Sequence, residues 1–317
     1  MKIFRKVFFI IFFSAFVVSG QEKSNFKPYT VTTTFKKLKK KYPFITPIKP
    51  IFSNNIISEE NVVYKKVDKT KLMLDIYYPS ENKNTSFPAV LLIHGGGWLT
   101  GSRDNQQIMA QHLALKGYVA ITVSYRLGLE AKYPAAVNDI KDAIVWLKQK
   151  ANKYHINKDK IAVLGASAGA QLATLVGVTA DNVLYTTDKK TSNKIQAIVN
   201  IDGIVSFIHP EAAESKKGKA SMAGIWLDGE KEENYKNWKE ASPLEYVGKN
   251  TPPILFVNSS YDRFHAGRDD MISILNRHKI YNQTFMLPKS PHSFWLVNPW
   301  FKEILHYVVC FLDNTLK

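Results

Sequence analysis

The chain has 317 residues, of which 45% are hydrophobic and 22% are charged, and it carries a net charge of +16. A chain of this length and hydrophobic content can bury a large core, which excludes a mainly disordered protein. Its 14 prolines and 16 glycines form no short repeat, so collagen-like and low-complexity structures are excluded as well. The composition is that of a globular protein.

Residues 1–20 differ in composition from the rest of the chain. Three basic residues within the first six precede an apolar stretch from Val7 to Val18, and Ser19 and Gly20 come just before Gln21. This stretch is shorter than the roughly 20 apolar residues that cross a bilayer. The pattern predicts a cleaved secretory signal peptide, and hence a secreted or periplasmic protein that is not held in a membrane. Its removal lowers the net charge from +16 to +13.

Residues 21–55 are predicted to be an N-terminal extension, because they contain four prolines and no sustained periodicity. Five lysines lie between Lys36 and Lys41. No aromatic residue that could stack on a base is interleaved with them, so the run indicates a solvated surface and no nucleic-acid partner. The only cysteine, Cys310, lies in an apolar run, which predicts a small buried thiol and excludes an intrachain disulfide.

Regular structure is predicted for residues 56–317, which we expect to form one domain. Apolar and polar residues alternate over 71–78, which predicts an antiparallel strand paired with 62–67. Helical stripes, one of them opened by Pro134, then separate short apolar runs that indicate buried strands. These runs cover 89–94, 118–124, 161–165, 195–201, 254–258 and 284–287.

Strands that alternate with helices in this way predict an α/β fold. We expect a doubly wound, mostly parallel sheet with an N-terminal antiparallel hairpin. Residues 204–247 are predicted to form a small insertion over the carboxyl edge of the sheet, and the sequence leaves open whether the insertion is a lid.

The segment Gly165-Ala166-Ser167-Ala168-Gly169 follows one predicted strand and directly precedes a helix. The two glycines allow a turn too tight for larger side chains, and the turn lifts the Ser167 hydroxyl clear of the sheet. Ser167 is therefore the predicted nucleophile.

A second segment, His94-Gly95-Gly96-Gly97-Trp98, follows the strand predicted at 89–94. Glycines leave backbone N–H groups unobstructed, and such groups stabilise the oxyanion that forms when a nucleophile attacks a carbonyl. We predict that the N–H groups of Gly96, Gly97 and Ala168 form the oxyanion hole. His94 is predicted to order the loop.

A serine nucleophile needs a base, and in this architecture the order along the chain is serine, acid, histidine. Among the histidines after residue 169, His292 lies in a loop between the last strand and the terminal helix and is the predicted base. The alternatives lie in helical patterns, in the insertion or in another loop: His209, His265, His278 and His306.

Two aspartates are candidates for the acid, because each follows a predicted strand. Asp262 follows the strand at 254–258, and Asp202 directly follows the strand at 195–201. We predict Asp262, which precedes the histidine-bearing loop by one strand, and keep Asp202 as its rival.

Taken together, the two glycine segments, Tyr125-Arg126 and Ala241-Ser242-Pro243 resemble α/β-hydrolase esterases of the hormone-sensitive-lipase-like type. More narrowly, residues 70–315 resemble the bacterial feruloyl and acetyl-xylan esterases. The resemblance implies that a serine hydrolase removes acetyl or feruloyl groups from plant polysaccharides without a metal or cofactor.

Trp98 and Trp295 lie near the site loops and are the candidates for contacting substrate. We expect Trp98 to limit the acyl chain to short groups. Two other functions were weighed. A prolyl-oligopeptidase-like peptidase normally carries a propeller, for which the chain has no room, and a non-catalytic glycan-binding protein would lack part of the triad. The acyl group, the sugar, the oligomeric state and the role of the run from Lys36 to Lys41, which could also attract anionic glycans or a membrane surface, stay open.

Overall fold

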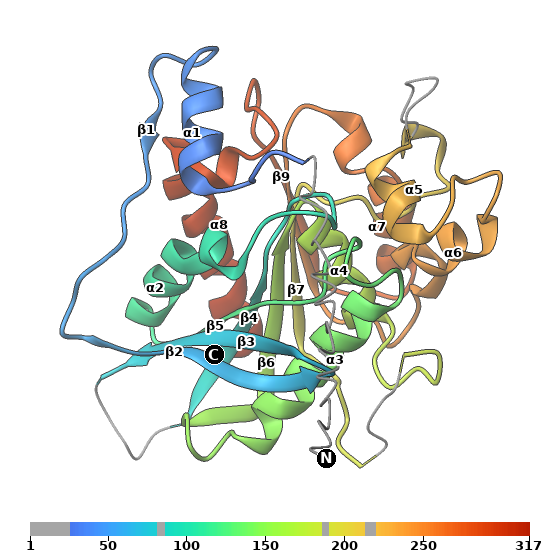
Figure 1. The fold of residues 1–317 in the computed structure, drawn as a ribbon. Coiled ribbons are helices and arrows are strands. Elements are labelled where there is room, and N and C mark those ends of the chain that lie inside the picture. Colours follow the sequence, from blue (N-terminus) through green and yellow to red (C-terminus); the bar gives the residue numbers. More distant parts are fainter. Residues whose placement is uncertain (1–25, 81–85, 186–189, 213–219) are drawn as a thin grey trace, which may run out of the picture.

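The computed structural model describes residues 26–80, 86–185, 190–212 and 220–317 (Figure 1). The predicted signal peptide lies outside the described residues. The main sheet has eight strands in the order β2-β3-β5-β4-β6-β7-β8-β9. The strands are β2 (Ile56–Val67), β3 (Thr70–Pro79), β4 (Phe87–Ile93), β5 (Val119–Val123), β6 (Ile156–Ala166), β7 (Ala197–Ile201), β8 (Ile254–Asn258) and β9 (Asn282–Met286).

The pairing within this sheet confirms the predicted fold class. Strands β2 and β3 form an antiparallel hairpin, and β3 joins the sheet antiparallel to β5. All other neighbouring strands are parallel. Parallel strands bring their carboxyl ends to one edge, which is where open α/β sheets place their ligands.

Helices cover both faces of the sheet, which explains why the strands have continuous apolar runs. Alternate residues of β4 enter different cores: Leu91 packs in the first, and Leu92 packs in the second. Helices α3 (Ala135–Gln149), α4 (Ala168–Val178) and α7 (Arg268–Arg277) contribute to the first core, and α2 (Gln107–Leu115) and α8 (Trp300–Leu316) contribute to the second.

The segment before the main sheet contains a helix that the sequence did not predict, α1 (Val31–Lys39). Its first turn is fixed by a capping box between Thr30 and Thr33, and three lysines lie in its last turn, where they suit the helix dipole. Strand β1 (Thr46–Pro47) then pairs with β10 (Val297–Asn298). This pairing joins the N-terminal segment to the C-terminal part of the chain.

The described parts of the predicted insertion, 204–212 and 220–247, contain the short helices α5 (Met222–Leu227) and α6 (Tyr235–Glu240). Figure 1 shows these two helices together on the opposite side of the molecule from α1. Trp226 is fully buried and Trp238 nearly so, which makes these helices part of the first core. None of the helices in the described ranges is long and apolar enough to cross a membrane.

The prediction of a buried thiol at Cys310 is wrong, because Cys310 is exposed. Its neighbours Val308, Phe311 and Leu312 are fully buried. Successive residues of a helix are rotated by about 100°, so Cys310 lies on the side of α8 that faces away from the sheet. An apolar run in sequence therefore did not distinguish the two sides of α8.

Candidate active site

Ser167 lies at the sharp turn between β6 and α4, with φ of 55° and ψ of −123°. This conformation is strained for a residue with a side chain. The flanking glycines allow the turn, because a Cβ on Gly165 would lie 2.0 Å from the Gly169 carbonyl oxygen. The Ser167 N–H donates to the carbonyl of Ile201 at 2.8 Å, which fixes the turn to β7.

His292 lies beside this hydroxyl, as the sequence predicted. Its Nε2 is 2.8 Å from the Ser167 Oγ, close enough for a hydrogen bond. The ring of Phe264 stacks on the imidazole at 3.5 Å with an interplanar angle of 9°, and Trp295 contacts it edge-on at 5.2 Å. Two aromatic side chains therefore hold the orientation of the imidazole.

The second nitrogen of His292 contacts Asp202. The Nδ1 of His292 is 2.7 Å from the Asp202 Oδ2, and the Asp202 side chain is 0% exposed. Ser259 supplies two further donors, its N–H to Oδ1 at 2.9 Å and its hydroxyl to Oδ2 at 2.7 Å. A buried carboxylate held in this way fixes the orientation of an imidazole and stabilises its charged form.

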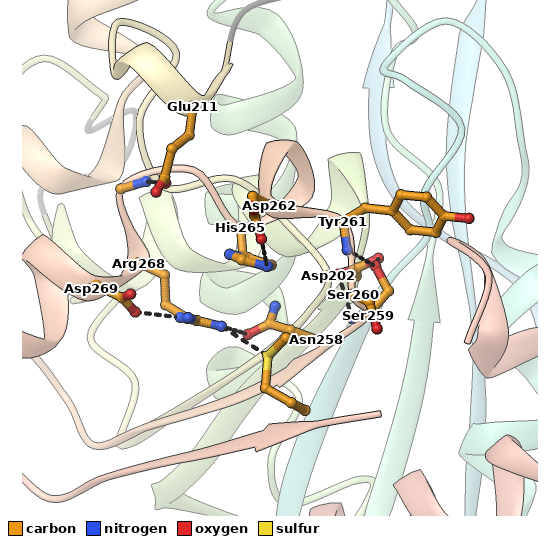
Figure 2. A network of polar contacts seen from close by, with 12 residues as sticks. Asp202, Glu211, Asn258, Ser259, Ser260, Tyr261, Asp262, His265, Arg268 and Asp269 are labelled. Atoms are coloured by element: carbon orange, nitrogen blue, oxygen red, sulfur yellow. Dashed lines mark hydrogen bonds and ion pairs between the residues drawn. The ribbon is translucent and has the colours of Figure 1, made fainter. Parts of the chain in front are cut away.

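This arrangement corrects the predicted acid, because Asp262 does not contact His292. The Asp262 side chain is 81% exposed, and its Oδ1 lies 3.7 Å from the His265 Nε2. Figure 2 shows Asp262 facing His265, whereas Ser259 lies against Asp202. The chain turns away after β8 into η4 (Asp262–Phe264), and this turn carries Asp262 to the surface.

The sequence contained a signal that favoured Asp202. Asp202 is the first residue after β7, whereas Asp262 is separated from the end of β8 by three residues. The sheet therefore fixes the position of Asp202, while the position of Asp262 depends on the path of a loop.

The glycine loop presents free backbone donors. Gly96 and Gly97 have φ values of 126° and 59°, and a Cβ on Gly96 would meet the Thr100 carbonyl oxygen at 2.0 Å. Within the described part of the chain, no hydrogen bond uses the N–H of Gly96 or Gly97. Both residues line a cavity together with Ser167 and Ala168. This arrangement suits the stabilisation of a negatively charged oxygen.

His94 is buried beneath this loop, as predicted for a residue that orders it. Its Nδ1 lies 2.9 Å from the Gly95 carbonyl oxygen, and its ring stacks on Tyr125 at 4.4 Å. The Tyr125 hydroxyl donates to the His94 carbonyl at 2.9 Å. Burial lowers the pKa of His94 to about 4, so the neutral ring donates its Nδ1–H to Gly95.

The cavity has a volume of about 390 Å³, and apolar side chains of the insertion, among them Phe207, Met222 and Trp238, form part of its lining. Trp98 lines it and is fixed in place: its ring stacks on Trp226 at 5.1 Å, and its indole N–H donates to Gln171 Oε1 at 2.9 Å. Trp295 is not among the lining residues and packs against His292 instead. Of the two predicted substrate contacts, only Trp98 faces the cavity.

The sequence missed a contribution of the N-terminal segment, which supplies Lys27, Tyr29 and Lys37 to the cavity lining. The Tyr29 hydroxyl donates to Ser293 Oγ at 3.2 Å, and Asn105 donates to the Tyr29 carbonyl at 3.0 Å. Burial raises the pKa of Tyr29 above its usual value. Proline-rich composition gave no indication that this segment reaches the site.

Comparison with known families and proteins shows that the chain is similar to esterases of the α/β-hydrolase fold. The BD-FAE family model matches residues 74–267, more than half of the chain. Esterase LipC of Mycobacterium tuberculosis is 26% identical over 62% of this chain and 49% of its own length. An arylesterase of Saccharolobus solfataricus is 37% identical over 51% of this chain and 49% of its own length. The chain thus spans about half the length of these curated relatives.

Solved structures show the same fold. A truncated carbohydrate esterase from gut microbiota superposes with a TM-score of 0.68 at 23% identity, covering 84% of this chain and 99% of that one. The Est2 esterase of Thermogutta terrifontis, with propionate bound, superposes with a TM-score of 0.67 at 22% identity, covering 82% and 94% of the two chains.

Proposed function

Because the chain belongs to the BD-FAE family, we propose that it hydrolyses carboxylic esters through a serine nucleophile. The observation that carries this proposal is the hydrogen-bonded series Ser167–His292–Asp202, which opens onto a cavity beside unpaired N–H groups. The esterases among its relatives support the proposal.

In the proposed mechanism, Ser167 Oγ attacks the ester carbonyl carbon while His292 Nε2 accepts the hydroxyl proton. Asp202 stabilises the imidazolium that results. The carbonyl oxygen becomes negatively charged and accepts hydrogen bonds from the N–H groups of Gly96, Gly97 and Ala168. One such donor is typically worth about 3–4 kcal/mol in the transition state.

The tetrahedral intermediate then collapses, the bond to the alcohol oxygen breaks, and His292 protonates the departing alcohol. Ser167 is left carrying the acyl group. A water molecule attacks the acyl-enzyme while His292 again accepts a proton, and the carboxylic acid leaves as Ser167 is restored.

We propose that the preferred acyl groups are short and that the alcohol is a saccharide. Trp98 supports a short acyl group, because its ring lines the cavity and is held there by stacking on Trp226. The resemblance to feruloyl and acetyl-xylan esterases supports a plant polysaccharide. Export through a signal peptide at residues 1–20 agrees with such a substrate and is part of the proposal.

The direct test is mass spectrometry of the intact protein after acid quenching of its reaction with an aryl acetate. We expect a mass increase of one acetyl group, located on Ser167. A panel of acetylated xylan, acetylated pectin, methyl ferulate and a prolyl anilide then defines the substrate. Hydrolysis of the anilide alone would support a peptidase, and binding of xylan without release of acetate would support a glycan-binding protein.

A further inference from the structure

The cavity mouth carries an excess of positive charge. Three cationic side chains line the cavity: Lys27, Lys37 and Arg263. Among the described residues, the only carboxylate that lines it is Asp202, which is fully buried and bound to His292. The three cations are exposed, so they face solvent at the entrance.

The whole sequence is basic, with 43 lysines and arginines against 27 acidic residues, and the described cavity lining shares this imbalance. Within the described ranges no carboxylate forms an ion pair with Lys27 or Lys37. An anionic ligand can therefore approach these two ammonium groups without displacing an acidic partner.

The segments that carry these cations contact residues next to His292. Tyr29, which lies between the two lysines in sequence, bonds to Ser293, the residue after His292. The Arg263 guanidinium lies 4.7 Å from the centre of the Phe264 ring, which stacks on the imidazole of His292. A group recognised by these cations would therefore lie close to the reacting ester.

An aromatic part of the cavity lining, in which Phe207 contacts both Trp98 and Trp238, is unsuited to an anion. Trp98, Phe207 and Trp238 are nearly buried there and present aromatic surface. A carboxylate placed among them would lose its hydration without gaining a charged partner, which is unfavourable by several kcal/mol. We therefore place a short, uncharged acyl group against these aromatic side chains, which leaves the alcohol side, beside the cations, for a negative charge on the substrate.

We propose that the site selects esters whose alcohol portion carries a carboxylate, and that Lys27 and Lys37, together with Arg263, recognise this group. The inference rests on the proposed esterase function. It identifies the substrate class as an acylated acidic saccharide, in which a carboxylate lies within reach of the acylated hydroxyl. Because the cations are exposed, dissolved salt screens their attraction for a carboxylate, with a Debye length of about 10 Å at 0.1 M ionic strength. The selectivity for anionic esters should therefore fall as salt is added.

The test compares kcat/KM for 3-acetoxybenzoate, which has a carboxylate on the alcohol side, with kcat/KM for its neutral analogue 3-acetoxybenzamide. We expect the ratio of the two values to exceed one at low salt and to fall as sodium chloride is added. Acetylated methyl glucuronoside and acetylated methyl glucoside give the same comparison on saccharides.

The variant is the double substitution Lys27→Gln and Lys37→Gln. We expect it to lower the ratio about tenfold at low ionic strength. The matched control is Lys36→Gln with Lys40→Gln, which removes the same charge from exposed positions that do not line the cavity. This control should leave the ratio unchanged.

Three results would overturn the inference while the esterase function stands. The first is a ratio near one in the unmodified protein, and the second is an equal fall of the ratio in the control double variant. The third is a preference for 4-nitrophenyl hemisuccinate over 4-nitrophenyl butyrate while 3-acetoxybenzoate is not preferred over 3-acetoxybenzamide. The last result would place the anion on the acyl side. Failure to hydrolyse any of these esters, with no acetyl adduct on Ser167, would overturn the proposed function and the inference with it.

Discussion

The Nδ1 of His292 lies 2.7 Å from the Oδ2 of Asp202, a residue 90 positions earlier in the chain. Strands β7 and β8 are parallel neighbours, so their carboxyl ends meet at the same edge of the sheet. Strand β7 supplies the carboxylate there, and Ser259, the first residue after β8, supplies two donors to it. Strand β7 therefore positions the carboxylate of Asp202, and the residue that follows β8 fixes its orientation by hydrogen bonds.

Substitution of the two aspartates tests this assignment. Asp202→Asn should lower kcat for an aryl acetate by roughly 10³–10⁴-fold, because the amide no longer stabilises the imidazolium and favours the wrong tautomer of His292. Asp262→Asn is the matched control and should change kcat less than twofold, since Asp262 is exposed and does not contact His292. A large loss in Asp262→Asn alone would return the role to the predicted residue.

Ser259→Ala should have a smaller effect on the same step. It removes the hydroxyl that donates to Asp202 Oδ2 but leaves the backbone N–H that donates to Oδ1. We expect kcat to fall about tenfold, with KM little changed, because one of two hydrogen bonds that fix the carboxylate is lost. Ser259→Thr keeps a hydroxyl and should restore most of kcat. Equal losses in the two variants would show that the hydroxyl is not the cause.

Ser167→Ala should lower kcat by about 10⁶-fold without lowering the midpoint of thermal unfolding. Alanine has the same positive-φ cost as serine, so the turn between β6 and α4 loses only the hydroxyl. His292→Ala should be comparably inactive, and the double variant should be little worse than either single one, because the residues act as a unit. Additive losses in the double variant would argue against that unit.

The fold and two members of the candidate triad were accessible from the sequence because their signals are local. The strand predicted at 254–258 coincides with β8, and the Gly-x-Ser-x-Gly turn lies where a strand meets a helix. The choice between Asp202 and Asp262 was not local, because it depends on how the chain turns after β8. Helix α1 was missed for a related reason: prolines surround it, and only the cap at Thr30 marks its start.

The length of the acyl chain tests the role of Trp98. Its ring lines the cavity and is held in place by stacking on Trp226, so we expect it to limit the depth open to the acyl chain, and kcat/KM should stay flat or fall from acetate to butyrate to octanoate. Trp98→Ala should deepen the cavity and make kcat/KM rise with length, by up to about 0.8 kcal/mol per buried methylene. Trp98→Phe keeps an aromatic ring and is the control. A steady rise in the unmodified protein would instead indicate a lipase-like site.

His94 predicts how the stability of the protein depends on pH. Its pKa is lowered from 6.5 to about 4 because the ring is buried. Between these two pH values the unfolded chain binds a proton that the folded chain does not, so the free energy of unfolding falls as the pH falls. One pKa unit corresponds to 1.36 kcal/mol. Relative to neutral pH, His94 should therefore lower the free energy of unfolding by about 2 kcal/mol at pH 5 and by about 3 kcal/mol near pH 4.

Urea unfolding at pH 7, 6 and 5 measures this contribution against two variants. His94→Gln should lose that part of the pH dependence, whereas His306→Gln, at an exposed position of α8, should keep the slope of the unmodified protein. Nitrogen NMR of the imidazole gives a direct check that needs no variant, because His94 should stay neutral at pH 5. A protonated His94 at pH 5 would show that burial does not lower its pKa, because the hydrogen bond to the Gly95 carbonyl would then stabilise the charged ring.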